Sequence, residues 1–398
     1  MGKLRFIDLF CGAGGMSLGL EMTNKFEIVG AIDFWQPAID TFRYNHPFLD
    51  ENKVICADVS NIFERNGSKV NGTYDLALDN IDVVVGGPPC QGLSLAGKRL
   101  IDDPRNQLFL SFVDAVNIIK PKAFIMENVP GLLSMNGGAI NKAILNAFSE
   151  IGYNHFSDHA PQILKAETYG VPQIRRRLFY VGFRDDISPK FENWPPKPIY
   201  KEYKSVNESK FITGDLFSDQ IDLEVLSDPI SVEEAIGDLP KLLSGEGGDE
   251  MNYTLTPITN YQKEMRLIPK QSLKLAKVFN HETPKHTEKL IKMIKLADQG
   301  ESVDPKYTDS KKWKSNKPSY TVKALGAGGG STNRRAFHYD PNQPRASTVR
   351  ENARIQSFPD YYRFLGSKTN QMTQVGNAVP PFLARAIGEA IYAKLEKK

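Results

Sequence analysis

The stretch from Val83 to Gln91, VVVGGPPCQ, constrains this chain most, because it determines how one cysteine leaves a strand. Three consecutive β-branched residues are typical of an interior strand of a parallel sheet. Two glycines then allow a turn where a Cβ would collide, and two prolines fix φ and remove two amide donors. Ligands of open α/β sheets bind beyond the carboxyl ends of the strands, so Cys90 is placed like a nucleophile. The alternative is a buried structural cysteine, a common fate of this residue type.

Length and composition indicate an ordinary soluble protein. A chain of 398 residues, 40% hydrophobic and 24% charged, can form one large domain and a smaller one. Its three cysteines show no C-x-x-C spacing, which predicts free thiols, a reducing compartment and no metal site. The first apolar run is short and contains Asp8, so neither a leader nor a membrane span is expected. We therefore expect a cytoplasmic chain.

The charge is distributed unevenly although its net value is only +3. Residues 185 to 260 hold 16 acidic and 6 basic residues, whereas residues 261 to 345 hold 18 basic and 8 acidic residues. A basic tract of this length is expected of a protein that binds a phosphate backbone, although solvated lysine-rich helices give the same count.

A second motif combines a short strand, residues 6 to 10, with the glycine-rich turn Cys11-Gly12-Ala13-Gly14-Gly15. Glycines there allow a cofactor to lie against the backbone at a helix N-terminus. Ser17 breaks the G-x-G-x-x-G spacing of dinucleotide enzymes, which disfavours a dehydrogenase. Asp33 ends the next apolar segment, where a carboxylate commonly holds ribose hydroxyls, and Asp58 ends a third. A purely structural turn is the alternative.

Two further segments carry polar groups at strand ends. Glu127 follows the apolar run 123 to 126, so it should share the sheet edge with Cys90; an exposed loop carboxylate is the alternative. In QIRRR, residues 173 to 177, alternation places Gln173, Arg175 and Arg177 on one face, although arginine runs are often simply solvated. The polar loop 91 to 105 is suited to closing over a substrate.

The sequence changes character from about Asp185, where it becomes proline-rich and acidic, and this indicates a domain boundary. Residues 284 to 298 predict a helix that Thr283 caps, with lysines away from its apolar positions. Lysines of this helix and of the run Lys311 to Lys314 are expected mainly to meet DNA phosphates, whereas Arg334 and Arg335, at the end of a glycine loop, are candidates for contacting guanine edges. The loop could equally be a linker.

Six ordered blocks resemble those of the DNA cytosine-5 methyltransferases. They lie within residues 4 to 185 and 345 to 395: FCGAGG (10–15), GPPCQ (87–91), ENV (127–129), QIRRR (173–177), RENAR (350–354) and QVGN (374–377). The resemblance implies an α/β fold, a Rossmann-like S-adenosylmethionine-dependent methyltransferase sheet with a smaller, mostly irregular target-recognition domain. The implied domains are 1–185, catalytic and cofactor-binding and completed by 368–398, and 186–367.

The resemblance also implies roles for individual residues. The catalytic residues would be Cys90, Glu127, Arg175 and Arg177. The cofactor S-adenosylmethionine would contact Phe10, Gly12, Gly14, Gly15, Asp33, Phe34, Asp58, Val59, Pro88, Asn377 and Ala378. DNA would contact Ser94, Lys98, Arg99, Thr321, Arg334 and Arg335.

The implied reaction methylates carbon 5 of a cytosine flipped out of a specific double-stranded DNA sequence, through a covalent adduct of Cys90. The expected protein is a monomer of the bacterial cytoplasm, associated with the nucleoid, and a companion restriction endonuclease is a candidate partner that the sequence leaves open. One alternative is an RNA cytosine-5 methyltransferase, whose Cys-Phe-Thr tripeptide is absent from this sequence. Another is an inactive DNA-binding regulator, which the intact Cys90, Glu127 and Arg177 disfavour.

Overall fold

The computed structural model describes residues 2–63, 78–89, 107–156, 161–187, 194–203, 226–268, 275–306, 308–324 and 336–395. The chain forms two compact units. The first comprises Met1–Leu164, Arg176–Lys197 and Phe364–Lys398, and the second comprises Lys165–Arg175 and Pro198–Arg363. These units differ from the expected domains, because 165–175 group with the second unit, and 186–197 and 364–367 with the first. The expected division into domains remains a prediction.

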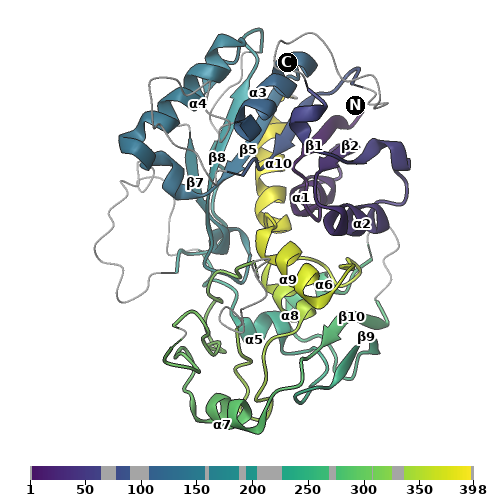
Figure 1. The fold of residues 1–398 in the computed structure, drawn as a ribbon, viewed down its shortest axis with the longest axis vertical. Helices are drawn as coiled ribbons and strands as arrows, with labels where there is room; N and C mark the ends of the chain where they lie inside the picture. Colours follow the sequence, from purple (N-terminus) through teal and green to yellow (C-terminus); the bar gives the residue numbers. More distant parts are fainter. Residues whose placement is uncertain are drawn as a thin grey trace. The chain divides into compact units, whose positions relative to one another are not determined.

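The first unit is built on an eight-stranded sheet (Figure 1). Its strands are β1 (Leu4–Leu9), β2 (Phe26–Asp33), β3 (Val54–Cys56), β4 (Val83–Gly86), β5 (Ala123–Asn128), β6 (His155–Phe156), β7 (Gln162–Lys165) and β8 (Arg176–Phe183). The order is β3-β2-β1-β4-β5-β8-β6, with β7 also paired to β8. Strands β1 to β5 run parallel, whereas β8 is antiparallel to β5. The expected α/β fold is therefore confirmed, with Val83 to Val85 fully buried in β4.

The first unit also contains the helices α1 (Gly15–Met22), α2 (Gln36–Asn45), α3 (Gln107–Ile119), α4 (Ala139–Glu150), α9 (Lys368–Asn377) and α10 (Pro381–Leu395), and the short 3-10 turns η1 (Glu51–Lys53), η2 (Val59–Asn61), η5 (Pro130–Leu133) and η6 (Met135–Gly138). The C-terminal α10 packs against α1, where a Cβ on Gly19 would lie 2.3 Å from the carbonyl oxygen of Pro381. Aromatic residues fill the core beside β5, where the rings of Phe124 and Phe148 stack at 3.9 Å.

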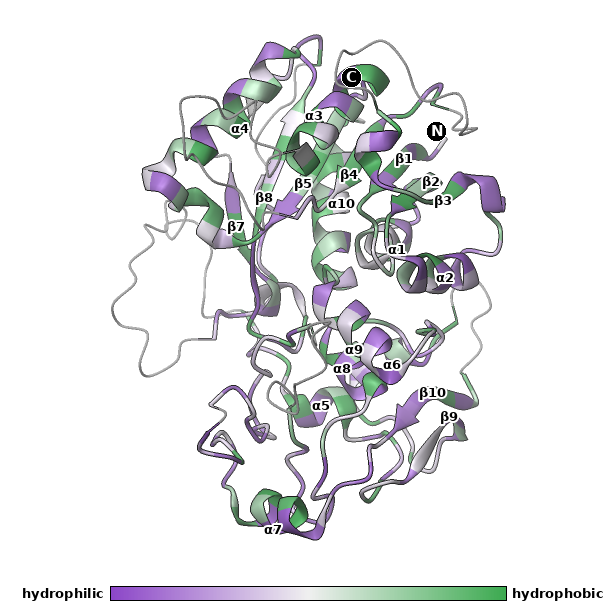
Figure 2. Ribbon diagram, in the orientation of Figure 1, coloured by the Kyte–Doolittle hydropathy of each residue, from purple (hydrophilic) through white to green (hydrophobic). Residues whose placement is uncertain are grey.

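The second unit contains η7 (Ala166–Tyr169), α5 (Val232–Ile236), α6 (Asn260–Met265), α7 (Glu288–Leu296), α8 (Val349–Ile355) and the hairpin β9 (Gly247–Asn252) and β10 (Lys277–Glu282). Its ribbon is largely hydrophilic in Figure 2, with hydrophobic stretches in α5 and α7. Buried ion pairs supply much of its interior. Arg354 bonds Asp360 at 2.6 Å and also pairs with Asp238, and all three side chains are buried.

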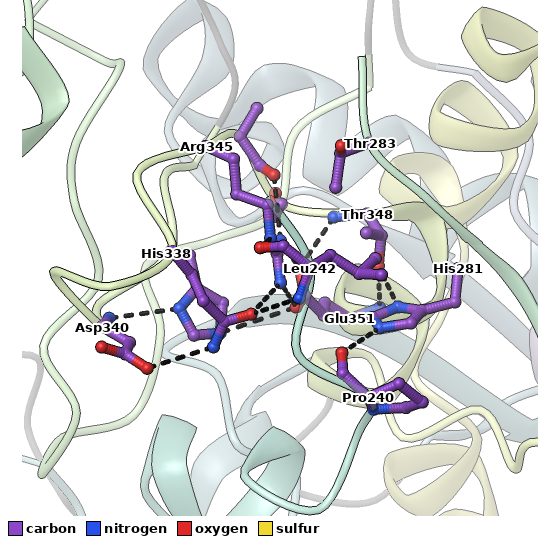
Figure 3. A network of polar contacts seen from close by, with 12 residues as sticks. Pro240, Leu242, His281, Thr283, His338, Asp340, Arg345, Thr348 and Glu351 are labelled. Carbon is purple, nitrogen blue, oxygen red and sulfur yellow. Dashed lines mark hydrogen bonds and ion pairs between the residues drawn. The ribbon is translucent and has the colours of Figure 1, made fainter. Parts of the chain in front are cut away.

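The same unit contains a second buried polar cluster, drawn in Figure 3. The guanidinium of Arg345 donates to both carboxylate oxygens of Glu351, at 2.7 and 2.9 Å. Glu351 also completes the N-terminal capping box of α8, because its carboxylate accepts the backbone N–H of Thr348. Such pairs tolerate burial only when each charge is matched and hydrogen-bonded.

The helix expected over residues 284 to 298 is shorter than predicted. It begins at Glu288, and Thr287 is its cap because its hydroxyl accepts the N–H of Leu290. The prediction that Thr283 caps this helix is wrong. Its hydroxyl donates to the carbonyl of Leu243, and the residue lies immediately after β10.

Candidate active site

An ion pair between Glu127 and Arg177 lies at the carboxyl end of β5. Arg177 Nε is 2.8 Å from Glu127 Oε1, and both side chains are mostly shielded from solvent. Arg177 comes from β8, which runs antiparallel to β5 and so brings its first residues beside the last residues of β5. The fold thus brings a carboxylic acid and a hydrogen-bond donor that lie 50 positions apart in sequence into direct contact.

The turn before Cys90 is held against this pair. A Cβ on Gly87 would lie 3.0 Å from Glu127 Oε2, and Asn128 Nδ2 donates to the carbonyl of Pro88 at 3.1 Å. A Cβ on Gly86 would lie 2.2 Å from the carbonyl oxygen of Leu9, so glycine is required there by packing. Sequence reasoning missed the role of Asn128, whose signal was a second polar residue at the strand end.

Cys90 itself lies outside the described residues. The two cysteines that are described, Cys11 and Cys56, are free. Burial raises the pKa of both thiols, which keeps them protonated and poorly nucleophilic.

The glycine-rich turn follows β1 as predicted. Phe10 has a φ of 60°, Gly12 of 53° and Gly14 of 85°, so three of five successive residues adopt left-handed backbone. A non-glycine residue at positive φ is strained, and such strain clusters at ligand sites. A Cβ on Gly12 would meet nothing within 4 Å, so open space adjoins this backbone. Gly15 is the first residue of α1.

Asp33 and Phe34 lie beside that turn. The Asp33 carboxylate accepts the N–H of Gly12 at 2.9 Å and that of Trp35 at 2.8 Å. Burial raises the pKa of Asp33 above its ordinary value. A carboxylate has about four acceptor positions, so Asp33 retains acceptor capacity for a ribose hydroxyl. The ring of Phe34 is 66% exposed, which leaves it accessible to a flat ligand.

Asp58 and the C-terminal block complete this edge. Asp58 Oδ1 accepts both the N–H and the hydroxyl of Ser60, and Val59 is buried behind it. The buried amide of Gln374 donates to the carbonyls of Pro37 in α2 and Leu365, each at 3.0 Å. That tether holds the end of α9, where Asn377 is exposed and Ala378 follows.

Arg175 makes a different contact from Arg177. In the second unit, its buried guanidinium donates to the carbonyl of Val322 at 3.1 Å, while the Gln173 amide oxygen accepts the N–H of Val322. Thr321 donates to the carbonyl of Ile174 at 2.7 Å. The QIRRR block therefore supports the segment 319–322. A direct catalytic role for Arg175 and a DNA contact of Thr321 remain predictions.

Five predicted DNA contacts lie outside the described residues: Ser94, Lys98, Arg99, Arg334 and Arg335. Within the described ranges, no group of three His, Cys, Asp or Glu side chains gathers as it would around a metal ion. None of the described helices has the length and apolar composition of a membrane span. A cavity of about 360 Å³ in the second unit is lined by groups such as Gln299, Asp340 and Gln343, which already bond protein partners.

Comparison with known proteins agrees with this geometry. Residues 4–393 match the family described as C-5 cytosine-specific DNA methylase. The chain is 34% identical to the Type II methyltransferase M.DdeI of Desulfomicrobium norvegicum, covering 98% of this chain and 88% of that protein. It is 33% identical to the Type II methyltransferase M1.HphI of Haemophilus parahaemolyticus, covering 98% and 87%.

Solved structures agree as well. A prophage-encoded E. coli protein described as a DNA modification methyltransferase matches with a TM-score of 0.75 and 25% identity, over 99% of this chain and 100% of that one. The S. pombe Dnmt2 methyltransferase shares the fold, with a TM-score of 0.55 and 16% identity over 99% of each chain. The expected Rossmann-like methyltransferase sheet is thereby confirmed. The chain belongs to the C-5 cytosine-specific DNA methylase family and is a DNA (cytosine-5-)-methyltransferase.

Proposed function

We propose that this enzyme transfers a methyl group from S-adenosylmethionine to carbon 5 of a cytosine flipped out of double-stranded DNA, through a covalent Cys90 adduct. The ion pair of Glu127 and Arg177 supports this proposal, because an acid and a cationic donor lie beside the turn whose residues precede Cys90 in the sequence. Carbon 5 of cytosine is a poor nucleophile, so addition to carbon 6 must precede methylation.

Each of these residues has a defined task. The Cys90 thiolate would add to carbon 6 and would leave after carbon 5 loses its proton. Glu127 would hold or protonate ring nitrogen 3 while charge enters the ring, and Arg177 would donate to the base carbonyl. The two side chains form an ion pair with each other, and a bound base would share them. The cytosine must leave the base stack first, since a duplex shields carbon 6.

The residues at the edge of β1, β2 and β3 fit S-adenosylmethionine, which supplies an activated methyl group. The bare backbone at Gly12 leaves room for the cofactor, while Asp33 retains acceptor capacity for the ribose hydroxyls. The exposed Phe34 ring could cover the adenine, and Asp58 could accept from its amino group. Phe10, Gly14, Pro88 and Asn377 would complete the contacts.

The proposed setting is a bacterial restriction-modification system in the cytoplasm and nucleoid. The relatives' description as Type II methyltransferases supports a companion restriction endonuclease, and the proposed oligomeric state is a monomer. Bisulfite sequencing of DNA from expressing cells would identify the methylated sequence. If no cytosine resists bisulfite conversion above background, DNA cytosine methylation by this enzyme is refuted.

The adduct has its own test. A duplex with 5-fluorocytosine at the target should trap the wild-type enzyme covalently in the presence of cofactor, because fluorine cannot leave as the proton does. Cys90→Ala should abolish both trapping and methylation. Glu127→Gln should lower turnover by on the order of 100-fold while cofactor affinity changes only a few-fold. Near wild-type methylation by Cys90→Ala would overturn the adduct mechanism.

A further inference from the structure

Helix α7 has one packed side and one basic side. Ile294 is fully buried and packs with Val303, Phe337 and Ala346. Leu290, Met293 and Ala297 pack against this cluster from the same side of the helix. At 100° per residue, the opposite side carries Lys289, Lys292 and Lys295 beside Glu288 and Leu296, and all three lysines are exposed.

Both ends of this helix are fixed. Thr287 caps its N-terminus, and the ammonium of Lys312 donates to the carbonyls of Ile294 and Ala297 at 3.2 and 3.1 Å. Lys312 is buried, so the expectation that the run 311–314 mainly meets phosphates is wrong for this residue. Its charge is used to satisfy carbonyls that the helix end leaves without partners. The three exposed lysines therefore project from a helix that is anchored, not from a loose tail.

The spacing of these lysines suits a polyanion. Residues three apart rise about 4.5 Å along a helix, so three ammonium groups span roughly 9 Å. Phosphates recur every 3.4 Å of axis along a DNA strand, so this span covers about two or three of them. Glu288 is the one acidic residue of α7, and among the described residues no carboxylate forms an ion pair with the three lysines. Lys285, three residues before the helix, and Lys314, two residues after Lys312, are also exposed.

We propose that the lysine face of α7, formed by Lys289, Lys292 and Lys295, binds the phosphate backbone of duplex DNA. The inference deepens the proposed function and rests on DNA being the substrate. Charge complementarity identifies the occupant as a polyanion with a regular phosphate spacing. The face supplies sequence-independent affinity, because ammonium groups on phosphates carry no base information.

The test compares two variants with the same loss of charge. Lys289→Gln/Lys292→Gln/Lys295→Gln removes the face, whereas Lys3→Gln/Lys120→Gln/Lys142→Gln removes three exposed lysines of the first unit. Binding to a methylatable duplex and to a scrambled duplex is measured by fluorescence anisotropy across a salt series. The first variant should lose on the order of 10- to 100-fold in affinity on both duplexes and flatten the salt slope by roughly 2 to 3. The control should stay within a few-fold of wild type.

A gain-of-function variant separates DNA contact from a structural role. Glu288→Gln removes the one acidic group of α7 and should tighten binding to both duplexes by a few-fold. Methylation of the same duplex by wild-type enzyme, measured alongside, tests the proposed function separately. If the α7 triple variant keeps wild-type DNA affinity and wild-type salt dependence, the inference is overturned, and a protein partner becomes the expected occupant of this face. Equal losses in the control variant would overturn it too, since net charge alone would then explain the effect.

Discussion

Lowering the pH from 7 to 4.5 should destabilise the second unit through two buried histidines. His281 Nε2 lies 2.8 Å from the carbonyl oxygen of Pro240, and its Nδ1 lies 2.9 Å from the hydroxyl of Thr348 (Figure 3). Nδ1 of His338 accepts the backbone N–H of Asp340 at 3.1 Å, so that nitrogen cannot carry a proton. Burial lowers the pKa of each histidine to about 4.

The sign and size follow from linkage. The folded-state pKa lies below the unfolded value of about 6.5, so between pH 6.5 and 4 the unfolded chain binds protons that the folded chain does not. The contribution of the two histidines to the free energy of unfolding is thus full above pH 6.5, and it falls as the solution is acidified. Over the window from pH 6.5 to 4, each histidine lowers the free energy of unfolding by roughly 3 kcal/mol. Together the two histidines give this free energy a pH dependence that approaches about 2.7 kcal/mol per pH unit. Below its ordinary pKa, Glu351 also makes the free energy of unfolding fall as the pH is lowered. Burial alone would raise the pKa of Glu351, but Arg345 lowers it.

The first unit should respond in the opposite direction. Burial raises the pKa of Asp8 to about 7, although the hydroxyl of Ser17 donates to it. Because the folded state then binds the proton more tightly than the unfolded chain, stability falls as the pH rises from about 4 to 7. Acidification therefore favours the Asp8 site while it disfavours His281 and His338.

Urea unfolding followed by tryptophan fluorescence can isolate the second unit. Of the three tryptophans, Trp313 is buried in that unit, so Trp35→Phe/Trp194→Phe leaves one reporter. The free energy of unfolding is measured from pH 7 to 4.5 in this background and in one that also carries His338→Gln. Gln keeps an acceptor and a donor but does not titrate, so it should remove about half of the slope. A slope below about 1 kcal/mol per pH unit between pH 6 and 5, or a slope that His338→Gln leaves unchanged, would refute the reasoning.

Two further predictions concern single contacts. Gly87→Ala should lower turnover by roughly 10-fold or more with little change in cofactor affinity, because its Cβ would lie 3.0 Å from Glu127 Oε2 and displace that carboxylate. Single-turnover kinetics with cofactor titration measure both, and unchanged turnover would contradict the placement of Glu127. Lys312→Met should destabilise the protein by about 1 to 3 kcal/mol, since the buried carbonyl of Ile294 and the partly buried carbonyl of Ala297 lose their donor, whereas exposed Lys314→Met should stay within about 0.5 kcal/mol. Equal denaturation midpoints for the two variants would exclude the anchoring role of Lys312.

The sequence alone determined the features that depend on local physics. Three valines, two glycines and two prolines predicted the strand and turn before Cys90, and the described part, Val83 to Pro89, follows that prediction. Apolar runs ending in Asp33 and Glu127 predicted which acids reach the carboxyl edge of the sheet, because a parallel strand order brings such ends together.

Tertiary structure decided why residues of the same type, close together in sequence, have different partners and different burial. Arg175 and Arg177 share a motif, but the first bonds Val322 and the second Glu127, because the antiparallel strand β8 begins between them at Arg176. Lys312 is buried under the carbonyl end of α7, whereas Lys314 is exposed. Periodicity cannot separate such pairs, since it records spacing along one element. The partner of each charge is set by a segment more than a dozen residues away, and only packing brings that segment into contact.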